Sequence, residues 1–263
     1  MRVFLSAVEN TDASKTEGGY PIVQRIVGDG LQMKWNLMSY YYIQSGNREW
    51  LAEFIRDNSE LVLVDSGAHT FQFGRKVDWD EYTKQFAHFI ESFDSPKVLG
   101  YFEMDIENVV GFGKVLELRS ILEDVTDKII PVWHPLRGIG NYEEMCEQYS
   151  GKIIAIGGFK GSDIRDDQYL SFLKVARKHN CKVHCLGMTR AEVLDKVPFD
   201  TVDSRTWVNG VMFGKIGYGR FAKGKVSKEY SRHNRGEVLV ECYKCGMQMQ
   251  EYYYNLWRRE CRD

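Results

Sequence analysis

Two acidic residues of this chain directly follow short apolar runs, and acids in such positions are candidates for catalytic roles. Leu61-Val-Leu-Val runs into Asp65-Ser-Gly, and Thr201-Val runs into Asp203-Ser-Arg in the same pattern. Two carboxylates facing each other over a pocket suit glycosidic chemistry, in which one attacks the anomeric carbon and the other moves a proton at the leaving group. The nucleophile must stay ionised, whereas its partner needs a pKa raised by burial or by a neighbouring charge. Asp65 and Asp203 are therefore the candidate catalytic residues.

A third acid and a histidine stand in comparable positions. Val98–Phe102 leads into Glu103-Met-Asp105, and an apolar run from residue 128 leads into His134. Glycines at positions 157, 158 and 187 end further apolar runs and leave room for a flat ligand beside the backbone. Two other interpretations stay open: the acids cap loops, or with His134 they bind Mg²⁺ or Zn²⁺.

Eight apolar runs with helical patterns between them predict an α/β fold, a (β/α)8 barrel. The expected strands are Arg2–Val8, Lys34–Tyr42, Leu61–Asp65, Val98–Asp105, Lys128–Pro135, Lys152–Gly158, Lys182–Met188 and Phe199–Asp203. Asp78 is expected to cap a helix, and Asn10–Gly30 reads as a long polar loop. The alternative, an open doubly wound sheet, lacks a Gly-x-Gly-x-x-Gly turn after the first strand. In a barrel the carboxyl ends of all strands meet on one face, which brings the acids together.

Composition sets the frame for these motifs. The chain has 263 residues, of which 43% are hydrophobic, and we expect a barrel domain over 1–210 and a C-terminal extension over 211–263. No run of about 18 apolar residues predicts a membrane span, and the first residues do not resemble a secretory signal, so we expect a cytoplasmic protein. From Val211 to Asp263 there are 11 Lys and Arg against 6 Asp and Glu, or +5. The rest then carries 24 against 31, or −7.

The residues at the strand ends resemble those of the tRNA-guanine transglycosylase superfamily, (β/α)8 barrels that exchange guanine for a 7-deazaguanine base. Asp65-Ser-Gly-Ala is similar to the family's Asp-Ser-Gly-Gly, and Phe102-Glu-Met-Asp105 is similar to its base-recognising stretch. Ile156-Gly-Gly-Phe159 resembles its Gly-Gly-Leu, and Leu186-Gly-Met188 resembles another strand end loosely. Phe199-Asp-Thr-Val-Asp-Ser204 resembles the nucleophile strand, with Asp200 as the alternative nucleophile if the register slips.

Departures from the family pattern favour one branch of it. Trp133-His134-Pro135 replaces the family's Gln-Gly-Gly, and Ala68-His69-Thr70-Phe71 replaces its Gly-Phe-Gln. The chain is also shorter than the tRNA-modifying members. In these respects it resembles the phage-type, DpdA-like DNA 7-deazaguanine transglycosylases, so the host-cell cytoplasm is the implied location.

The resemblance implies a double displacement on DNA. Asp203 would attack C1′ of a deoxyguanosine, guanine would leave with a proton from Asp65, and a base such as preQ0 would take its place. The implied base-binding residues are Asp105, His134, Gly157, Gly158, Phe102, Met188 and Ser66. The target nucleotide must leave the helical stack to reach such a pocket. The same chemistry on tRNA, and a non-catalytic barrel that binds nucleic acid or a deazapurine, are the alternatives.

The basic C-terminal segment predicts a polyanionic partner, since cations contact phosphates and aromatic rings stack on bases. The candidate nucleic-acid-binding residues are Lys215, Arg220, Lys223, Lys225 and Arg205. The alternative is a solvated surface that binds nothing.

The cysteines of this segment have zinc-like spacing. His233, Cys242, Cys245 and Cys261 form His-x8-Cys-x2-Cys-x15-Cys, and the related tRNA enzymes carry a structural zinc, so we expect a Zn²⁺ site here. The alternative is a set of buried thiols. The other titratable residues on expected barrel elements are predicted to be core, namely Cys146, Cys181, Cys185, His179 and His184.

Overall fold

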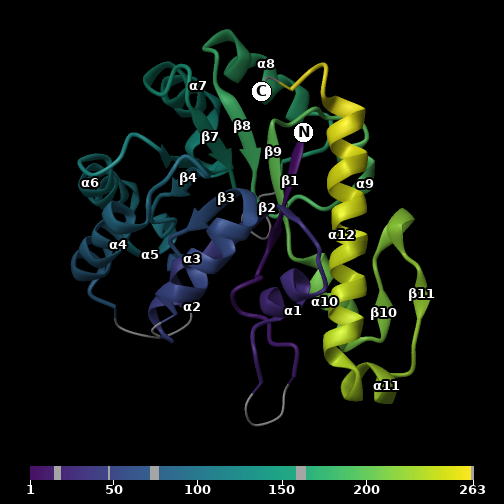
Figure 1. Cartoon of the computed structure of the whole chain (residues 1–263). Helices are drawn as coiled ribbons and strands as arrows, with labels where there is room; N and C mark the ends of the chain where they lie inside the picture. Colours follow the sequence, from purple (N-terminus) through teal and green to yellow (C-terminus); the bar gives the residue numbers. More distant parts are fainter. Residues whose placement is uncertain (15–18, 47, 72–76, 158–163, 262–263) are drawn as a thin grey trace.

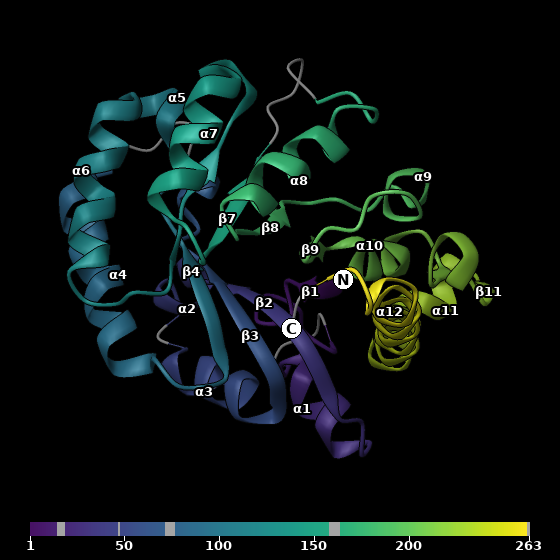
Figure 2. The same cartoon turned by 90° about the horizontal axis from the view of Figure 1, so that it is seen from above.

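The computed structural model describes residues 1–14, 19–46, 48–71, 77–157 and 164–261. Its main sheet is parallel, in the order β5-β4-β3-β2-β1-β9-β8-β7-β6. The strands are β1 (Arg2–Ser6), β2 (Met33–Ser39), β3 (Ser59–Asp65), β4 (Val98–Phe102), β5 (Ile129–Ile130), β6 (Val132–Trp133), β7 (Ile153–Ile156), β8 (Lys182–Cys185) and β9 (Thr201–Ser204). All eight predicted strands are present, and helices surround the sheet (Figures 1 and 2).

A proline explains why eight predicted strands appear as nine. Pro131 separates β5 from β6 and has no N–H to continue the ladder. Its carbonyl oxygen still accepts a hydrogen bond from Ala155 N at 2.8 Å, while β5 pairs with β4 and β6 pairs with β7. Both ends of the strand order therefore lie in one stretch, 129–133, and the sheet closes on itself as a (β/α)8 barrel.

The helices follow the predicted alternation. They are α1 (Ile22–Gly28), α2 (Tyr40–Gln44), α3 (Glu49–Asn58), α4 (Trp79–Phe93), α5 (Glu107–Val110), α6 (Phe112–Glu123), α7 (Gly138–Gln148), α8 (Tyr169–Lys178), α9 (Ala191–Leu194), α10 (Thr206–Met212), α11 (Lys228–His233) and α12 (Arg235–Trp257). Asp78 caps α4, since its carboxylate accepts a hydrogen bond from Glu81 N. The prediction of a loop over Asn10–Gly30 is wrong in its second half, where α1 buries Ile22, Val23 and Ile26 at helical spacing.

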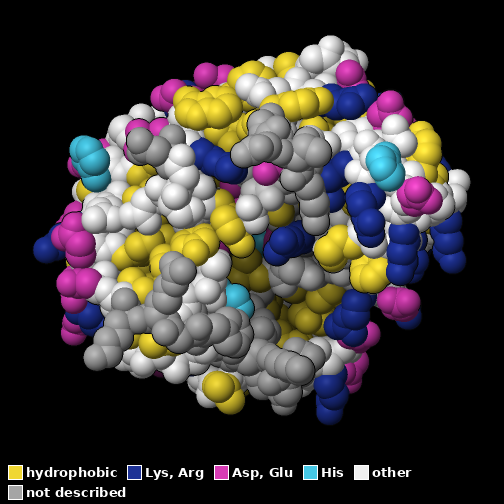
Figure 3. Space-filling model, turned by 90° about the horizontal axis from the view of Figure 1, so that it is seen from below, with side chains coloured by type: hydrophobic (Ala, Val, Ile, Leu, Met, Phe, Trp, Pro, Cys, Tyr) yellow, Lys and Arg dark blue, Asp and Glu magenta, His cyan; other side chains and the backbone are white. Residues whose placement is uncertain are grey.

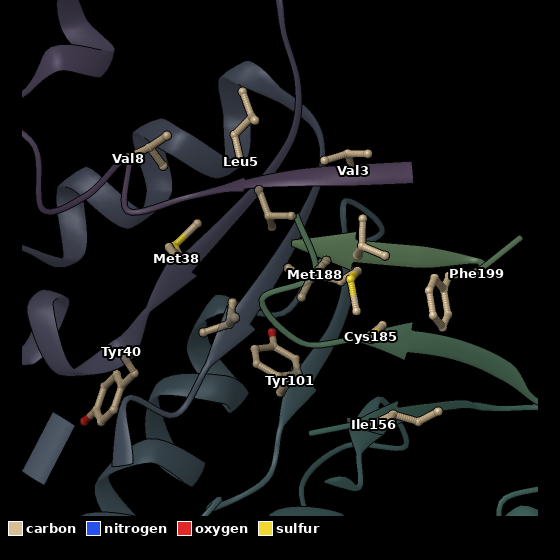
Figure 4. Close-up of a cluster of buried hydrophobic side chains, with 14 of the residues drawn as sticks. Val3, Leu5, Val8, Met38, Tyr40, Tyr101, Ile156, Cys185, Met188 and Phe199 are labelled. Atoms are coloured by element: carbon tan, nitrogen blue, oxygen red, sulfur yellow. The ribbon is translucent and has the colours of Figure 1, made fainter. Parts of the chain in front are cut away.

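Side-chain alternation along the strands builds two cores. Phe4 packs inside the barrel with residues such as Leu63 and Phe102, whereas Val3 and Leu5 belong to the layer between strands and helices. Figure 4 shows Val3 and Leu5 on the same side of β1. This interior cluster fills the part of the barrel nearer the amino ends of the strands. The carboxyl ends of the strands are left available for a site.

The C-terminal segment is part of the barrel wall. Helix α12 packs against β1, α1 and α10, and lies beside the barrel strands in Figure 1. Gln250 on α12 is fully buried, and its amide donates hydrogen bonds to the carbonyl oxygens of Val3 (2.8 Å) and Trp35 (2.7 Å). The expected C-terminal segment thus contains an outer helix, α12, that binds β1 and β2 through Gln250. A hairpin of β10 (Lys215–Ile216) and β11 (Gly224–Lys225) precedes it.

A chain of buried hydrogen bonds ties α12 across the barrel wall to α3. Tyr243 OH donates to Asn36 Oδ1 (2.9 Å), and Asn36 Nδ2 donates to Ser59 Oγ (2.9 Å). Ser59 Oγ in turn donates to the carbonyl oxygen of Ile55 (2.7 Å). Asn36 is a polar side chain on an inner strand, and this network satisfies it.

Tyr243→Phe tests this network. We expect the free energy of unfolding to fall by about 1–2 kcal/mol, because Asn36 Oδ1 is left buried without its donor. Denaturant unfolding measures it. The matched control is Tyr254→Phe on the same helix, whose hydroxyl has no hydrogen bond within the described residues; it should change stability by less than about 0.5 kcal/mol. Equal effects of the two variants would contradict the assignment.

Within the described ranges, none of the helices has the length and apolar character needed to cross a membrane.

Candidate functional site

A cavity of about 430 Å³ opens at the carboxyl ends of the barrel strands. Six strand-end residues singled out from the sequence line it together, namely Asp65, Asp105, His134, Gly157, Gly187 and Asp203. Figure 3 looks onto this face, which is hollowed near its centre. The prediction that the strand-end residues meet over one cavity is thus met by six residues from six different strand ends.

Asp203 is held by three hydrogen-bond donors. Ser6 Oγ donates to its Oδ2 (2.9 Å), and Gly187 N donates to its Oδ1 (2.5 Å). His184 Nε2 lies 3.4 Å from the same Oδ1. Burial alone would raise the pKa of Asp203, but the hydrogen bond and charge of His184, together with the donors at Gly187 and Ser6, hold that pKa below its ordinary value. Asp203 is therefore ionised at neutral pH.

Asp65 has the opposite electrostatics. Its Oδ2 accepts a hydrogen bond from Gly67 N at 3.1 Å. Burial raises the pKa of Asp65 to about 7, and the negative charges of Asp105 and then Asp203 add to the rise against the effect of Gly67. A Cβ at Gly67, where φ is +74°, would lie 2.4 Å from Tyr41 Cβ, so the turn that presents Asp65 requires glycine.

The two carboxyl groups are thus set to different protonation states in one cavity. Asp203 is a carboxylate at neutral pH, whereas the raised pKa of Asp65, about 7, lets Asp65 hold a proton there. Carboxyl groups whose pKa values are pushed apart in this way can serve as nucleophile and as general acid. The arrangement is chemically suited to displacement at an anomeric carbon.

Asp105 and His134 form a pair that lines the same cavity. His134 Nε2 lies 2.6 Å from Asp105 Oδ1, and His134 is buried. A Cβ at Gly157 would lie 2.6 Å from His134 Cε1, so glycine at this position makes room for the imidazole ring. The pair offers hydrogen-bonding groups to a ligand, and the glycine backbone lets a ring approach.

Other candidates for base binding lie elsewhere. Phe102 is buried in the barrel interior, with its ring centroid 4.8 Å from that of His184, and Ser66 is fully buried and donates to the carbonyl oxygen of Glu103. Met188 lines an adjoining cavity of about 540 Å³ that shares Gly157 and Gly187 with the first. Gly158 and Phe159 lie outside the described residues.

Two further acids at or near the strands have structural roles. Glu103 is buried in an ion pair with Arg119, with 2.6 Å between Oε2 and Nε. Asp200, the alternative nucleophile, precedes β9 and accepts a hydrogen bond from Val183 N through its carboxylate. It lies at the amino end of the strand, away from the cavity that Asp203 lines.

Glu9 lines the cavity and was missed from the sequence. It is 1% exposed, its Oε1 accepts a hydrogen bond from Ser39 N (3.1 Å), and its Oε2 has no partner among the described residues. Burial raises the pKa of Glu9 to about 7, and the charge of Asp65 contributes to the rise. Ala7 nearby has φ of +70°, a strained conformation of the kind that clusters at functional sites. An acid following the first apolar run was the available signal.

The predicted nucleic-acid-binding residues are all exposed, but they differ in their partners. Arg220 forms an ion pair with Asp195 and contacts Tyr252, and Lys223 forms one with Glu241. Lys215 and Lys225 face each other across the β10–β11 hairpin, and Arg205 lines the cavity that holds Asp65 and Asp203. In Figure 3, Lys and Arg side chains gather on the right, the side where the hairpin lies in Figure 1.

The four residues expected to hold zinc are not brought together. Cys242 Sγ contacts the carbonyl oxygen of Lys215, His233 Nδ1 contacts that of Glu229, and Cys261 Sγ contacts that of Phe199. Helix α12 runs for 12 residues from Cys245 to Trp257, roughly 18 Å at 1.5 Å per residue, before Cys261 is reached. No three His, Cys, Asp or Glu side chains of the described ranges form a metal-binding group. These residues do not fit a Zn²⁺ ion, and Cys242 and Cys245 are buried thiols.

The remaining core predictions differ in outcome. Cys146, Cys181 and Cys185 are buried, as predicted. His184 is also buried, but it contacts Asp203 and so belongs to the site as well.

Comparisons with known proteins do not assign this chain to a family. No family model matches the sequence, and no curated protein matches it. One similar solved structure is that of a protein from Aquifex aeolicus VF5, with a TM-score of 0.49 and 9% identity over 93% of this chain and 92% of that one. Another is a GH10 endoxylanase from a sugarcane soil metagenome, with a TM-score of 0.41 and 9% identity over 95% and 83%. Similarity at these scores carries no argument about activity.

The raised pKa of Glu9 predicts a pH-dependent gain of stability in Glu9→Gln. Folding penalises the ionised carboxylate, so the penalty is absent below its ordinary pKa of 4.5 and complete above about 7. We expect the stability of Glu9→Gln relative to wild type to rise by about 2–4 kcal/mol between pH 4 and pH 8. Unfolding with urea at several pH values measures this.

Glu53→Gln, a change of the same chemistry at an exposed position on α3, is the control and should differ from wild type by less than about 0.5 kcal/mol. A pH-independent difference for Glu9→Gln would contradict the proposed burial of an uncompensated acid.

Proposed function

We propose that this protein is a transglycosylase that exchanges guanine in DNA for a 7-deazaguanine base through a glycosyl intermediate on Asp203. The supporting observation is that Asp203 and Asp65 line one cavity with pKa values displaced in opposite directions. The resemblance of the strand-end motifs to the transglycosylases is the reason for proposing a 7-deazaguanine base. The basic C-terminal segment is the reason for proposing a nucleic-acid polymer as substrate.

The first half of the reaction uses both carboxyl groups. An Asp203 oxygen attacks C1′, the N-glycosidic bond breaks, and its electron pair leaves with guanine, which takes the proton of Asp65. Ser6 and Gly187 orient Asp203 through its two oxygens. Because Asp65 is protonated below about pH 7, it can donate at neutral pH.

The second half reverses these roles. The incoming 7-deazaguanine gives its ring N–H proton to the Asp65 carboxylate and attacks C1′, and the ester bond to Asp203 breaks. Asp105 and His134 would hydrogen-bond the edge of either base, and the glycine backbone at Gly157 and Gly187 gives a flat ring room. The cavity volume of about 430 Å³ is within the range of small-molecule sites.

Removal of the nucleophile tests the chemistry directly. We expect Asp203→Asn to lower incorporation of labelled guanine or preQ0 into DNA by at least about 10³-fold, because no covalent intermediate can form. Asp200→Asn is the matched control and should retain incorporation in the fraction that folds. A denaturation-resistant protein–DNA adduct should form with wild type and be absent in Asp203→Asn.

Several outcomes of that assay would overturn the proposal. Incorporation into tRNA in preference to DNA, measured with both polymers under one set of conditions, would reassign the substrate. Nucleic-acid binding by wild type and Asp203→Ala without incorporation into either polymer would mean a non-catalytic barrel.

The pKa of Asp65 predicts the pH dependence of base release. With wild type we expect the rate of adduct formation to fall as pH rises through about 7, since Asp65 loses the proton that guanine needs. Asp65→Asn should be about 10²–10⁴-fold slower and should lose this decline. Single-turnover rates between pH 5 and 9 measure it, with Asp65→Glu as the variant that restores a titrating acid. A decline that persists in Asp65→Asn would assign the proton to another group.

A further inference from the structure

A second cavity, of about 710 Å³, lies beside the catalytic one and is basic. It is formed by the end of α10, by α11, by the first residue of α12 and by residues 13 and 14. Its cationic side chains are those of Lys228, Arg232 and Arg235, His233 also lines it, and no Asp or Glu of the described residues does. A cavity of this composition is suited to an anionic ligand.

The cations of this cavity differ from those of the hairpin in their partners. Lys228 and Arg232 are exposed, and within the described ranges no acid forms an ion pair with either. By contrast, Arg220 is held by Asp195, and Lys223 by Glu241. An external phosphate can therefore pair with Lys228 and Arg232 without displacing an internal partner.

Apolar side chains accompany these charges. Met212, which lines the cavity, is 61% exposed, and its neighbour Phe213 is 57% exposed. Large exposed hydrophobic side chains next to cations suit a nucleic-acid ligand, since phosphates pair with the cations and accessible base or sugar surfaces contact the apolar groups. A small inorganic anion would not need them.

Helix α10 sets the distance between the two cavities. Arg205, immediately before this helix, lines the catalytic cavity, and Met212, at its end, lines the basic one. These positions are 7 residues apart, roughly 10 Å along the helix at 1.5 Å per residue. Successive phosphates of one strand in a duplex advance about 3.4 Å, so this length corresponds to about three nucleotides.

We propose that the basic cavity binds phosphates of the substrate strand about three nucleotides from the nucleotide in the catalytic cavity. This rests on the proposed function for the polymeric substrate and assigns its docking to α10 and α11 instead of the hairpin. The protein then recognises a polymer and discriminates against free nucleosides.

The test compares two double variants that each remove two cations. Lys228→Ala/Arg232→Ala removes two cations of the basic cavity. Lys223→Ala/Lys244→Ala is the control and removes two cations that both form ion pairs with Glu241. Fluorescence anisotropy measures the affinity of each for a labelled 20-nucleotide DNA and an RNA of the same sequence, at several salt concentrations. All positions are exposed or half-buried, and thermal melting checks that each variant folds.

We expect the cavity variant to bind at least about tenfold more weakly and the control to stay within about threefold of wild type. The slope of log affinity against log salt should decrease by about 1.5 in the cavity variant, since two phosphate contacts are lost. With oligonucleotides of increasing length, wild type should gain affinity once about three nucleotides flank the target, and the cavity variant should lack this step.

Equal weakening in both variants, or no measurable binding of either polymer to wild type, would overturn the proposal. Binding is measured without turnover, so Asp203→Asn should bind like wild type. Failure of base exchange with intact cavity-dependent binding would count against the proposed chemistry, whereas exchange that is insensitive to Lys228→Ala/Arg232→Ala would count against this docking site.

Discussion

The unequal supply of hydrogen-bond donors to two buried carboxyl groups is the constraint from which the proposed chemistry follows. Asp203 receives donors from Ser6, Gly187 and His184, and they offset the cost of burying its charge. Asp65 receives one from Gly67 and faces other acids, so burial raises its pKa. A low-dielectric site makes both effects larger than they would be in water. The same barrel face thus holds a carboxylate and a proton donor.

The donors of Asp203 depend on parts of the chain distant from it. Ser6 lies on β1, and its carbonyl oxygen accepts a hydrogen bond from Trp207 Nε1 on α10. Gln250 on α12 binds the carbonyl oxygen of Val3 on the same strand. The C-terminal helix therefore supports the strand that carries Ser6 and leads to Glu9. The segment 211–263 has a structural role in the site in addition to its basic surface.

The carboxyl-end face has acids in one cavity and cations in a neighbouring one. Acids line the cavity where a base would react, and the cations of the neighbouring cavity lie on α11 and at the start of α12. A phosphate backbone would be repelled by the acids and attracted by the neighbouring cations, which favours entry of a base and exclusion of its backbone. Under the proposed function, affinity for a polymer and reactivity toward its base would come from different residues of one surface.

The sequence by itself determined the eight strands, their order along the chain and the acids at their carboxyl ends. Apolar runs and caps are local signals, since each residue's burial follows from its neighbours in the same element. That is why the barrel and the cavity-lining set of Asp65, Asp105, His134, Gly157 and Asp203 were predictable. Asp200 and Asp203 could not be separated by pattern alone, because both adjoin the same strand, and only its direction in the barrel assigns one to each end.

Only the tertiary structure decided which side chains share an environment. His184 looked like a core histidine and is one, yet the pairing of β8 with β9 also brings it to Asp203. The zinc-like spacing of Cys242, Cys245 and Cys261 had no such outcome, because α12 is one continuous helix that carries the third cysteine to the far end of the barrel. Residues at a ligand-like spacing come close in space only when the chain between them reverses direction. Whether it does so depends on helix length and strand register, which are set by the packing of the whole barrel.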